Sequence, residues 1–488
     1  MLKMVIGFCL TFSLLLFTGC QQLATIPNNE PPLTSIIKLN KFNSLLSGQK
    51  FPLTTDGKID GEIDITSNNP EIVSYDPNSG MLIAGNAGRA VITVSKNKTP
   101  ENNSMSTDLE IEVVESRNIP IISISTAFKR PITSKEDYLR ANVTIQDLNN
   151  PEYNIEKTGF KDEIRGRGNT TWAKPKKPYR IKFDKKTSLF GLKAAKDWVL
   201  LANHQDPTLL LNTIAFELGK RFEMRFSHNY FHVDVLLNGE YIGNYLLTEH
   251  NQVAPGRVEI DENKGFFIEF DNYFDEEPKF TSEHYKLPIL ISSPECSINE
   301  TGYSDKYLFV REKINTLETL LYNKGEPIPD NSYKNHVDLQ SFIDFLLIHE
   351  ILKNHELKHP KSTFMYMDAD GILHMGPLWD FDWAFGFGDG EYRYFTNPYD
   401  LCDKHPFFER FYSDPGFIVL YKNRWNIMKG EVMAMENFMD DMKKQIESSH
   451  KANTTIWDLN INFDEEIEKM KLWWRTRISY LDEVINDL

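Results

Sequence analysis

Two aspartates on either side of a phenylalanine are the residues of this chain best suited to hold a metal ion. Asp380 and Asp382 lie in the segment Gly376–Gly386, GPLWDFDWAFG, after a Gly-Pro turn. If this segment is extended, both carboxylates lie on one face and Phe381 packs into the core, because alternate residues of a strand share a face. Mg²⁺ prefers a few carboxylates together with phosphate oxygens, so the pair suits that cation. Structural aspartates that cap turns would give the same pattern.

A glycine-rich segment further upstream has the composition of an anion-binding loop. Gly166 and Gly168 let backbone amides approach an anion, and Arg165 and Arg167 add charged donors. Asn169 ends this run. The sequence predicts a phosphate site here, and a tight hairpin is the alternative.

The strand expected after this loop carries two cations. Tyr179, Ile181 and Phe183 fall on one face of this strand, and Arg180 and Lys182 fall on the other. Paired cations that follow a glycine loop suit a triphosphate, much as the β3 lysine of a kinase does. A basic strand at the protein surface is the alternative.

A third group of polar residues follows an expected helix, in which apolar residues recur at helical spacing between positions 342 and 353. Asn354, His355 and Glu356 therefore close this helix or begin the loop after it. The run from His355 to His359 also matches the zinc-peptidase signature H-E-x-x-H. Pro360 biases His359 away from the helical conformation that this signature requires, so we disfavour a zinc site.

These groups must be positioned by a folded protein of two or three domains. The chain has 488 residues, 41% of them hydrophobic and 25% charged, which is typical of globular proteins. Its 70 acidic and 54 basic residues give a net charge of −16, which disfavours nucleic acid as a partner. Four cysteines without a C-x-x-C pair are too few for a disulfide scaffold, and Cys296 and Cys402 could pair or stay free.

Residues 1–20 resemble the signal peptide of a bacterial lipoprotein. Lys3 precedes an apolar stretch, Met4–Phe17, that has the length of a signal peptide, and the segment ends in Leu-Phe-Thr-Gly-Cys at Cys20. The resemblance implies lipidation of Cys20 and a membrane-anchored, extracytoplasmic position at the bacterial cell surface. Residues 21–34 would form a linker. A buried helix or ordinary secretory cleavage is the alternative.

Residues 35–115 are predicted to form an all-β sandwich, because short alternating strands are separated by Asn, Pro and Gly turn signals. The stretch SNNPEIVSYDPNSGMLIAGNAGRAVITV resembles the bacterial Ig-like domain of group 2. This resemblance implies a spacer or an adhesion module without catalytic residues.

Residues 118–488 mix strand-like and helix-like segments, as an α+β domain does. Six segments of this region, in the same order, resemble the spore-coat protein H (CotH) kinase family: Arg165–Trp172, Lys176–Phe183, Asp197–Asp206, Leu237–Glu249, Gly376–Gly386 and Phe407–Trp425. The resemblance implies an atypical protein-kinase-like fold that binds ATP with Mg²⁺ or Mn²⁺. It also implies phosphorylation of Ser or Thr hydroxyls in a surface or spore-coat protein, and a Ser/Thr-rich protein is the expected substrate.

The resemblance assigns the nucleotide to the upstream segments. Gly166–Asn169 would cover the phosphates, with Arg165 and Arg167 as charged donors. Lys182, together with Arg180, would neutralise the phosphates, and Glu249 would orient Lys182 through an ion pair.

The resemblance assigns the metal and the proton to the downstream segments. Asp380 would bind Mg²⁺ as the Asp of a kinase D-F-G does, and Asp382 or Asn354 would complete the metal shell. Glu356 would take or orient the proton of the acceptor hydroxyl.

Two departures from the family pattern leave a non-catalytic adhesin or scaffold, a pseudokinase, as the alternative function. Glu356 stands where many members have aspartate, and the extra methylene shifts the carboxylate by about 1 Å. Leu211 replaces an arginine that often precedes the asparagine found here as Asn212.

Other residues are expected to build the core or are left unassigned. Glu269 lies on an expected strand, 266–271, and the sequence does not decide whether its carboxylate reaches the site. The core is expected to contain Trp198, Trp425, Trp473 and Trp474. The buried face of the last helix is expected to contain Ile467, Met470, Trp474, Ile478, Leu481, Ile485 and Leu488.

Overall fold

The structure is a computed structural model that describes residues 44–53, 63–96, 105–114, 118–296, 298–299, 302–322, 328, 331–388 and 392–488. The expected lipoprotein signal, with Cys20, and the expected linker lie outside the described residues. Among the described helices, none combines the length and the apolar character that a membrane span requires.

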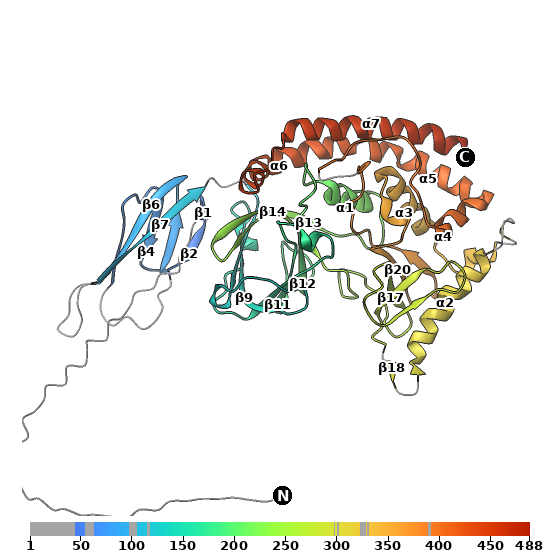
Figure 1. Cartoon of the computed structure of the whole chain (residues 1–488), viewed down its shortest axis with the longest axis horizontal. Helices are drawn as coiled ribbons and strands as arrows, with labels where there is room; N and C mark the ends of the chain where they lie inside the picture. Colours follow the sequence, from blue (N-terminus) through green and yellow to red (C-terminus); the bar gives the residue numbers. More distant parts are fainter. Residues whose placement is uncertain are drawn as a thin grey trace, which may run out of the picture.

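The N-terminal region is rich in β-structure, as its strand periodicity indicates. Its strands form two sheets around one apolar core (Figure 1). The first sheet has the order β1 (Ser44–Leu46), β7 (Met105–Val114), β6 (Gly88–Lys96) and β3 (Ile63–Ser67). The second has the order β2 (Lys50–Pro52), β5 (Met81–Ala84) and β4 (Val73–Asp76). The Ig-like character of this region stays a prediction.

A closed barrel follows this region along the chain. Its strands, in the order in which they pair, are β10 (Asp162–Gly166), β11 (Tyr179–Thr187), β12 (Ala195–Leu201), β14 (Glu240–Glu249), β13 (Tyr230–Leu237), β8 (Ile121–Thr126) and β9 (Leu139–Gln146). The predicted alternation in β11 is confirmed, because Tyr179, Ile181 and Phe183 lie in the barrel core. Arg180 and Lys182 therefore face outward.

A second sheet and a set of helices form the remainder of the molecule. The sheet has the order β16 (Lys279–Thr281), β17 (Pro288–Ser293), β15 (Phe266–Phe270), β20 (Thr363–Met367) and β21 (Leu373–Met375). A short hairpin pairs β18 (Ile298–Asn299) with β19 (Gly302–Tyr303). The helices are α1 (Leu211–Arg221), α2 (Asp305–Leu321), α3 (Leu339–Leu352), α4 (Pro406–Glu409), α5 (Pro415–Met433), α6 (Met435–Ile456) and α7 (Phe463–Asp487).

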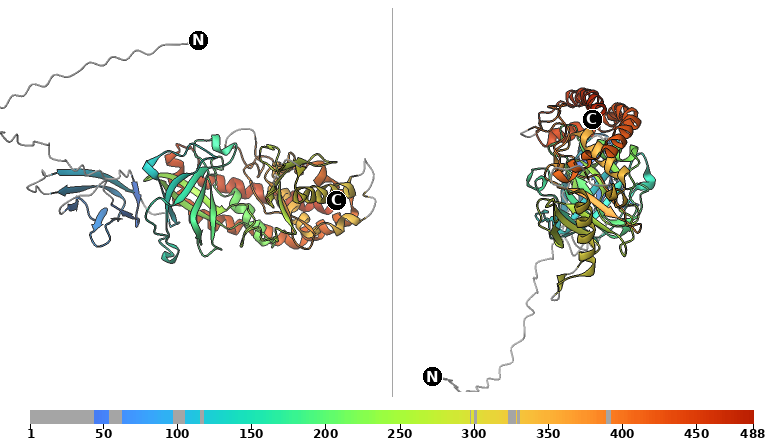
Figure 2. Two further views of the ribbon diagram at one scale, coloured as in Figure 1. Left: turned by 90° about the horizontal axis from the view of Figure 1, so that it is seen from below. Right: turned by 90° about the vertical axis from the view of Figure 1, so that its right-hand side faces the viewer.

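The two long helices α6 and α7 connect the barrel with the second sheet along one side of the molecule (Figures 1 and 2). The N-terminal strands lie beyond the barrel at one end of the molecule, and the second sheet with α2 lies towards the other end (Figures 1 and 2). At the barrel end of α6, Ser449 donates to Asp234 and Asn453 accepts from the Asn244 amide, so α6 is tied to β13 and β14.

An apolar seam joins the outer face of the barrel to the second sheet. Val199 of β12 and Leu246 of β14 are outward-facing barrel residues that pack in one cluster with Phe267, Phe364 and Trp379. Burial of such side chains is the main force that holds the two parts together. The residues that follow Trp379, including the paired aspartates, are therefore held at this seam.

The expected core positions in the barrel and in the helices are largely confirmed. Trp425 and Trp474 are fully buried, and Trp198 and Trp473 are buried as well. The predicted face of α7 is buried except for its last member, since Leu488 lies one residue beyond the helix and is 43% exposed.

Replacement of Trp474 tests the contribution of this core. The side chain is fully buried, and its indole nitrogen donates to the Val432 carbonyl at 3.1 Å. We expect Trp474→Ala to lower the free energy of unfolding by about 3–5 kcal/mol, measured by chemical denaturation followed by circular dichroism. Leu472→Ala, a change at a 64% exposed position of the same helix, should cost less than about 0.5 kcal/mol. Equal losses in the two variants would contradict the packing described here.

Candidate functional site

The site lies where the loop after β10 approaches the segment after β21. Arg167, in the glycine segment, places its guanidinium 5.3 Å from the centre of the Trp379 ring. Burial lowers the pKa of Arg167, and the nearby carboxylates of Asp380, Asp382 and Glu269 oppose that shift. The cation that faces the paired aspartates is therefore Arg167.

The paired aspartates are held by hydrogen bonds to neighbouring segments. Asn212 of α1 donates to Asp382 Oδ1 at 2.8 Å and accepts from the Phe381 amide at 3.0 Å, and Ser362 Oγ lies 3.4 Å from Asp380 Oδ2. Phe381 is fully buried, as predicted. Asp380 has a φ of 60°, so the predicted extended conformation is wrong, and the two carboxylates are brought together by a turn instead.

Burial disfavours the charged form of both aspartates, and repulsion from Asp380 adds to this effect at Asp382. Burial raises the pKa of Asp380, against the opposing charge of Arg167. Burial and the Asp380 carboxylate raise the pKa of Asp382 to about 7. Asp206, in the loop before α1, is also buried and has its pKa raised to about 6, although it accepts from the Leu211 amide at 2.9 Å.

Two further acids face the same point. Burial and the Asp380 carboxylate raise the pKa of Glu356 to about 9, and Glu356 Oε2 is buried without a hydrogen-bond partner in the described part of the chain. Burial, followed by Asp271, raises the pKa of Glu269 well above its usual value, and Arg167 opposes this shift. Glu269 thus reaches the site, which the sequence did not decide.

Lys361 is a second cation at this cluster. Its ammonium lies 4.6 Å from the centre of the Trp383 ring and 5.0 Å from that of the Tyr273 ring. Its charge partly offsets the rise in the pKa of Glu356 and of Asp380. Arg167 and Lys361 therefore approach the acids from the barrel and from the second sheet, respectively.

Four arginines gather on the barrel side of the site around His250. Burial lowers the pKa of His250 well below its usual value, and Arg180, Arg167, Arg257 and Arg165 lower it further. Arg180 and Arg165 are direct neighbours across β10 and β11. So many cations around a neutral imidazole suit a polyanion such as a triphosphate.

Arg257 was not anticipated from the sequence. It is 8% exposed, donates to the Asp197 carbonyl and lies 5.0 Å from the centre of the Trp198 ring. Arg180 also contacts Asp197, with Nη2 at 2.8 Å from Oδ1. Asp197 thus orients both arginines, which lie 77 positions apart in a sequence that gives no sign of their proximity.

Lys182 lies one step further from the site than Arg180, on the same face of β11. Its ammonium is 3.9 Å from Glu163 Oε2 and 5.4 Å from the centre of the Tyr138 ring. Alternate residues of a strand are about 6.6 Å apart, so Arg180, not Lys182, is the nearer to Arg167. The Lys182 ammonium is thus paired with Glu163 of the adjacent strand β10 and not with the acids of the site.

The expected ion pair between Lys182 and Glu249 is wrong. Glu249 accepts from the backbone and side-chain nitrogens of Asn229 at 2.8 and 2.7 Å, and lies 3.8 Å from His228 Nδ1. Burial alone would raise the pKa of Glu249, but the hydrogen bonds from His228 and Asn229 lower it below its usual value. The Glu249 carboxylate is thus engaged with His228 and Asn229 and not with Lys182.

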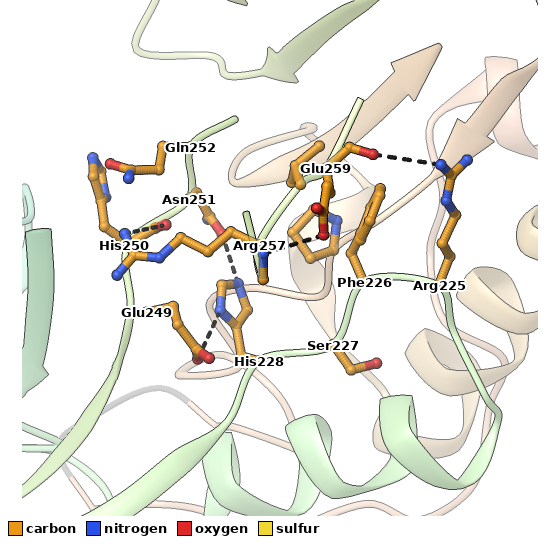
Figure 3. Close-up of a pocket in the computed structure, with 13 residues that line it drawn as sticks. Arg225, Phe226, Ser227, His228, Glu249, His250, Asn251, Gln252, Arg257 and Glu259 are labelled. Carbon is orange, nitrogen blue, oxygen red and sulfur yellow. Dashed lines mark hydrogen bonds and ion pairs between the residues drawn. The ribbon is translucent and has the colours of Figure 1, made fainter. Parts of the chain in front are cut away.

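A cavity of about 180 Å³ lies beside Glu249 (Figure 3). His250 and Arg257 line it, so it borders the arginine cluster. His228 lies between Glu249 and Asn251 in this view, with Nε2 at 2.6 Å from Asn251 Oδ1. The side chains that line the cavity are thus engaged with one another.

The glycine segment covers the site as a tight loop. An added Cβ at Gly166 would lie 2.3 Å from the Trp172 ring, and Gly168 has a φ of +78°, so both positions require glycine. Asn169 Oδ1 accepts from Lys135 at 2.8 Å. Thr170 reaches the opposite side of the site, where its hydroxyl lies 3.1 Å from that of Tyr273.

Asn354 connects the loop after α3 with the aspartate segment. Its Oδ1 accepts from the Glu356 amide at 3.2 Å, and its Nδ2 donates to the Asp380 carbonyl at 3.2 Å. The side chain expected to complete a metal shell is thus engaged with two backbone groups, and it positions the carboxylates of both segments.

The zinc-peptidase alternative has no structural support. His355–Leu357 form one 3₁₀ turn after α3, so His355 and His359 do not share a helical face. His359 is exposed, whereas Glu356 is buried. In the part of the chain that the structure describes, no three side chains of His, Cys, Asp or Glu are placed to hold a metal ion on their own.

The site nevertheless suits a cation that is shared with phosphate. Asp380 and Asp382 are two carboxylates held close together, and Glu356 Oε2 is a buried acceptor without a partner among the described residues. Mg²⁺ typically uses one or two carboxylates and takes its other ligands from phosphate and water. The donor set therefore fits Mg²⁺ or Mn²⁺ bound with a nucleotide.

Comparison with known proteins gives one family. The model of the family described as "CotH kinase protein" matches residues 164–481, more than half of the chain. No curated protein matches the chain. Two crystal structures of human protocadherin-24 EC1-2, one of them Form II, are similar to 33% of this chain and to 94% of their own, at 10% identity and a TM-score of 0.13. A score this low supports no statement about the fold.

Glu269→Gln tests the electrostatic description of the site. Because the pKa of Glu269 is raised in the folded protein, the unfolded chain loses its proton first as pH rises, and stability falls between the two pKa values. Glutamine does not titrate, so we expect the variant to gain about 1–2 kcal/mol over the wild type at pH 8 and less at pH 4.5. Denaturation at both pH values measures this gain. A gain that does not change with pH would contradict the description.

Proposed function

The chain belongs to the CotH kinase protein family, and on that premise we propose that it transfers the γ-phosphate of ATP to Ser or Thr hydroxyls of a protein. One observation carries the proposal: Arg167, which lies against the Trp379 ring, interacts electrostatically both with Arg180 and with the carboxylates of the site. A metal–nucleotide complex has the complementary arrangement, with phosphates that need cations and a metal that needs carboxylates.

In this proposal the arginine cluster binds the phosphates. Arg165, Arg167, Arg180 and Arg257 all act electrostatically on His250 and so surround one point. In the loop Gly166–Asn169, the amides of Gly166 and Arg167 donate to the Ser134 and Pro178 carbonyls at 2.9 and 3.2 Å. The amides of Gly168 and Asn169 are therefore the ones that would approach phosphate oxygens. In this proposal Arg167 takes the role that the family resemblance gave to Lys182, because Arg167 is the barrel-side cation that acts on Asp380.

Asp380 and Asp382 would hold Mg²⁺ or Mn²⁺. When bound, the cation would supply charge neutralisation for the phosphates. It would also offset the charges of Asp380 and Asp382, which add to the effect of burial in raising the pKa of Glu356. Asn212 and Asn354 keep the two aspartates in place through their hydrogen bonds to Asp382 and to the Asp380 backbone.

Glu356 would orient the acceptor hydroxyl and take its proton. The hydroxyl oxygen bonds to the γ-phosphorus, the bond from that phosphorus to the bridging oxygen breaks, and ADP leaves. The Glu356 amide is fixed by Asn354 Oδ1, so its carboxylate is presented from a rigid turn. Positioning and charge neutralisation carry most of the catalysis of such a transfer.

The same proposal includes the domain arrangement, the membrane anchor and the acceptor protein that the sequence predicts. The barrel and the second sheet would act as the two lobes of an atypical kinase-like fold, with the site between them. Lipidation at Cys20 would anchor the chain outside the cytoplasm, and the N-terminal strands would form an Ig-like spacer. The acceptor would be a Ser/Thr-rich surface or coat protein.

A phosphotransfer assay tests this proposal. The full chain is incubated with labelled ATP, Mg²⁺ or Mn²⁺ and a Ser-rich basic protein. We expect Asp380→Ala and Arg167→Met each to lower kcat/KM at least about 100-fold, because each removes charge stabilisation of the phosphates or metal. Lys182→Met, on the same barrel face but paired with Glu163, should lower it by less than about tenfold.

Absence of transfer by the wild type, or transfer undiminished in Asp380→Ala, would contradict the proposal. Calorimetry with Mg·ATP then identifies the alternative. Binding without turnover would indicate a pseudokinase, and absence of binding would favour an adhesin or scaffold.

A further inference from the structure

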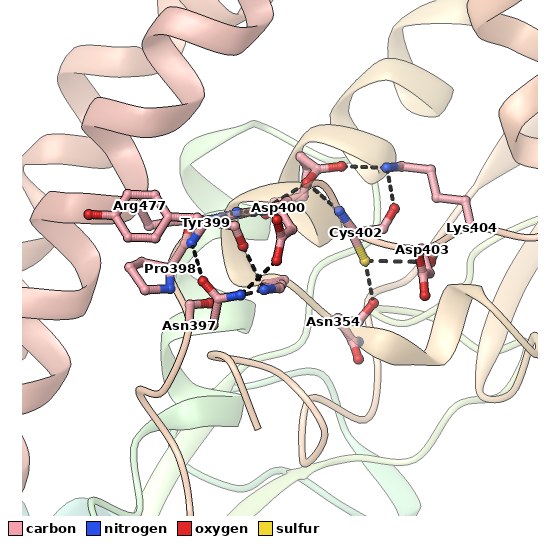
Figure 4. A network of polar contacts seen from close by, with 11 residues as sticks. Asn354, Asn397, Pro398, Tyr399, Asp400, Cys402, Asp403, Lys404 and Arg477 are labelled. Atoms are coloured by element: carbon pink, nitrogen blue, oxygen red, sulfur yellow. Dashed lines mark hydrogen bonds and ion pairs between the residues drawn. The ribbon is translucent and has the colours of Figure 1, made fainter. Parts of the chain in front are cut away.

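A buried arginine of the last helix contacts the loop that carries the candidate base. Arg477 of α7 is fully buried. Its Nε and Nη2 donate to the Glu350 carbonyl at 3.2 and 2.7 Å, and its Nη1 donates to the Pro398 and Asp400 carbonyls at 2.9 and 2.6 Å. Four carbonyl contacts from one guanidinium fix both the end of α3 and the loop 397–404 (Figure 4).

The same guanidinium also pairs with the Glu350 side chain. Arg477 Nη2 lies 2.7 Å from Glu350 Oε1, which in turn accepts from the Cys402 amide at 2.7 Å. Lys404 donates to Glu350 Oε2 and, at 2.8 Å, to the Cys402 carbonyl. Glu350 is 1% exposed, so this carboxylate is stable in the core only because its oxygens are fully paired.

Cys402, whose amide is bound to Glu350, also contacts Asn354 through its thiol. Its Sγ lies 2.8 Å from the Asn354 carbonyl, as Figure 4 shows. Burial raises the pKa of Cys402 to about 12, so at neutral pH the thiol keeps its hydrogen and can donate it. Lys353 Nζ adds contacts to the Asn397 and Tyr399 carbonyls at 3.0 and 2.6 Å, which hold the same loop against the start of the turn.

Asn354 is the end of this chain of contacts and the start of the site. It is fully buried, and its side chain joins the Glu356 amide to the Asp380 carbonyl. Its backbone amide also donates to the His349 carbonyl at 3.0 Å, which closes α3. Movement of Asn354 would therefore move the candidate base and the candidate metal ligand together.

We propose that Arg477 is a positioning residue that acts through Glu350, Cys402 and Asn354 to hold Glu356 and Asp380 in their relative places. The catalytic part of this inference rests on the proposed phosphotransfer. A lysine would not replace Arg477, because the three N–H donors of an ammonium cannot make the five hydrogen bonds that the guanidinium makes to the Glu350, Pro398 and Asp400 carbonyls and to Glu350 Oε1.

The first test compares two arginines of α7 in the full chain. Arg477→Met removes the buried contacts, whereas Arg475→Met removes an exposed ion pair with Glu436 and serves as the matched control. We expect Arg477→Met to lower kcat for phosphotransfer about 100-fold while the KM for ATP stays within about threefold, because the arginine cluster is untouched. Arg475→Met should leave both values unchanged.

Hydrogen exchange supplies a readout that does not need activity. We expect the amides of residues 353–357 to exchange about tenfold faster in Arg477→Met, with exchange in β10 and β11 unchanged. Unchanged exchange at 353–357 would overturn the inference, as would faster exchange with unchanged kcat. A wild type without phosphotransfer would defeat the proposed function, and the exchange result alone would then decide whether Arg477 positions this turn.

Cys402 provides a second pair of variants if Arg477→Met does not fold. Cys402→Ala removes the donor to the Asn354 carbonyl, and Cys402→Ser keeps a donor at that position. We expect faster exchange at 353–357 and a lower kcat in Cys402→Ala, with both values closer to those of the wild type in Cys402→Ser. Equal behaviour of the two variants would overturn the inference.

Discussion

One half-buried guanidinium holds the two charged halves of the site against each other. Arg167 faces the carboxylates of Asp380, Asp382 and Glu269, and it belongs to the group of arginines that surrounds His250. Its position depends on the glycine loop, which must pass close to Trp172, and on the apolar seam that presents Trp379. Without this contact the arginines would repel one another, and the acids would do the same.

The periodic features of the fold could be predicted from the sequence. Alternation in β11, the helix before Asn354 and the buried face of α7 each follow from the spacing of apolar residues over a short segment. The aspartate segment could not be predicted in the same way. Its conformation depends on the left-handed Asp380 and on hydrogen bonds from Asn212, about 170 positions away, which no local spacing records.

Some residues of the site could likewise be predicted from the sequence, and others could not. The sequence motifs contained Arg167, Asp380, Asp382 and Glu356, and the structure brings all four together. Arg257 and Lys361 were missed because an isolated cation in a loop has no distinguishing neighbours in sequence. The family analogy could not tell which of several cations on one barrel face lies nearest the acids, and the Lys182 ammonium lies beside Glu163 instead.

The site lowers the stability of the folded protein. Its buried carboxylates have raised pKa values because burial and like charges disfavour their ionised forms, and this lowers stability at neutral pH. The surrounding contacts hold these groups in place: Asn212 and Asn354 act directly, and Arg477 acts from the far helix. A ligand that carries a divalent cation and several anionic oxygens would relieve both the repulsion among the carboxylates and the repulsion among the arginines.

The most direct measurement is therefore a crystal structure of the full chain with Mn²⁺ and a non-hydrolysable ATP analogue. We expect the phosphates within hydrogen-bond distance of Arg167 and the manganese bound to Asp380, and a nucleotide that contacts neither residue would contradict the central claim.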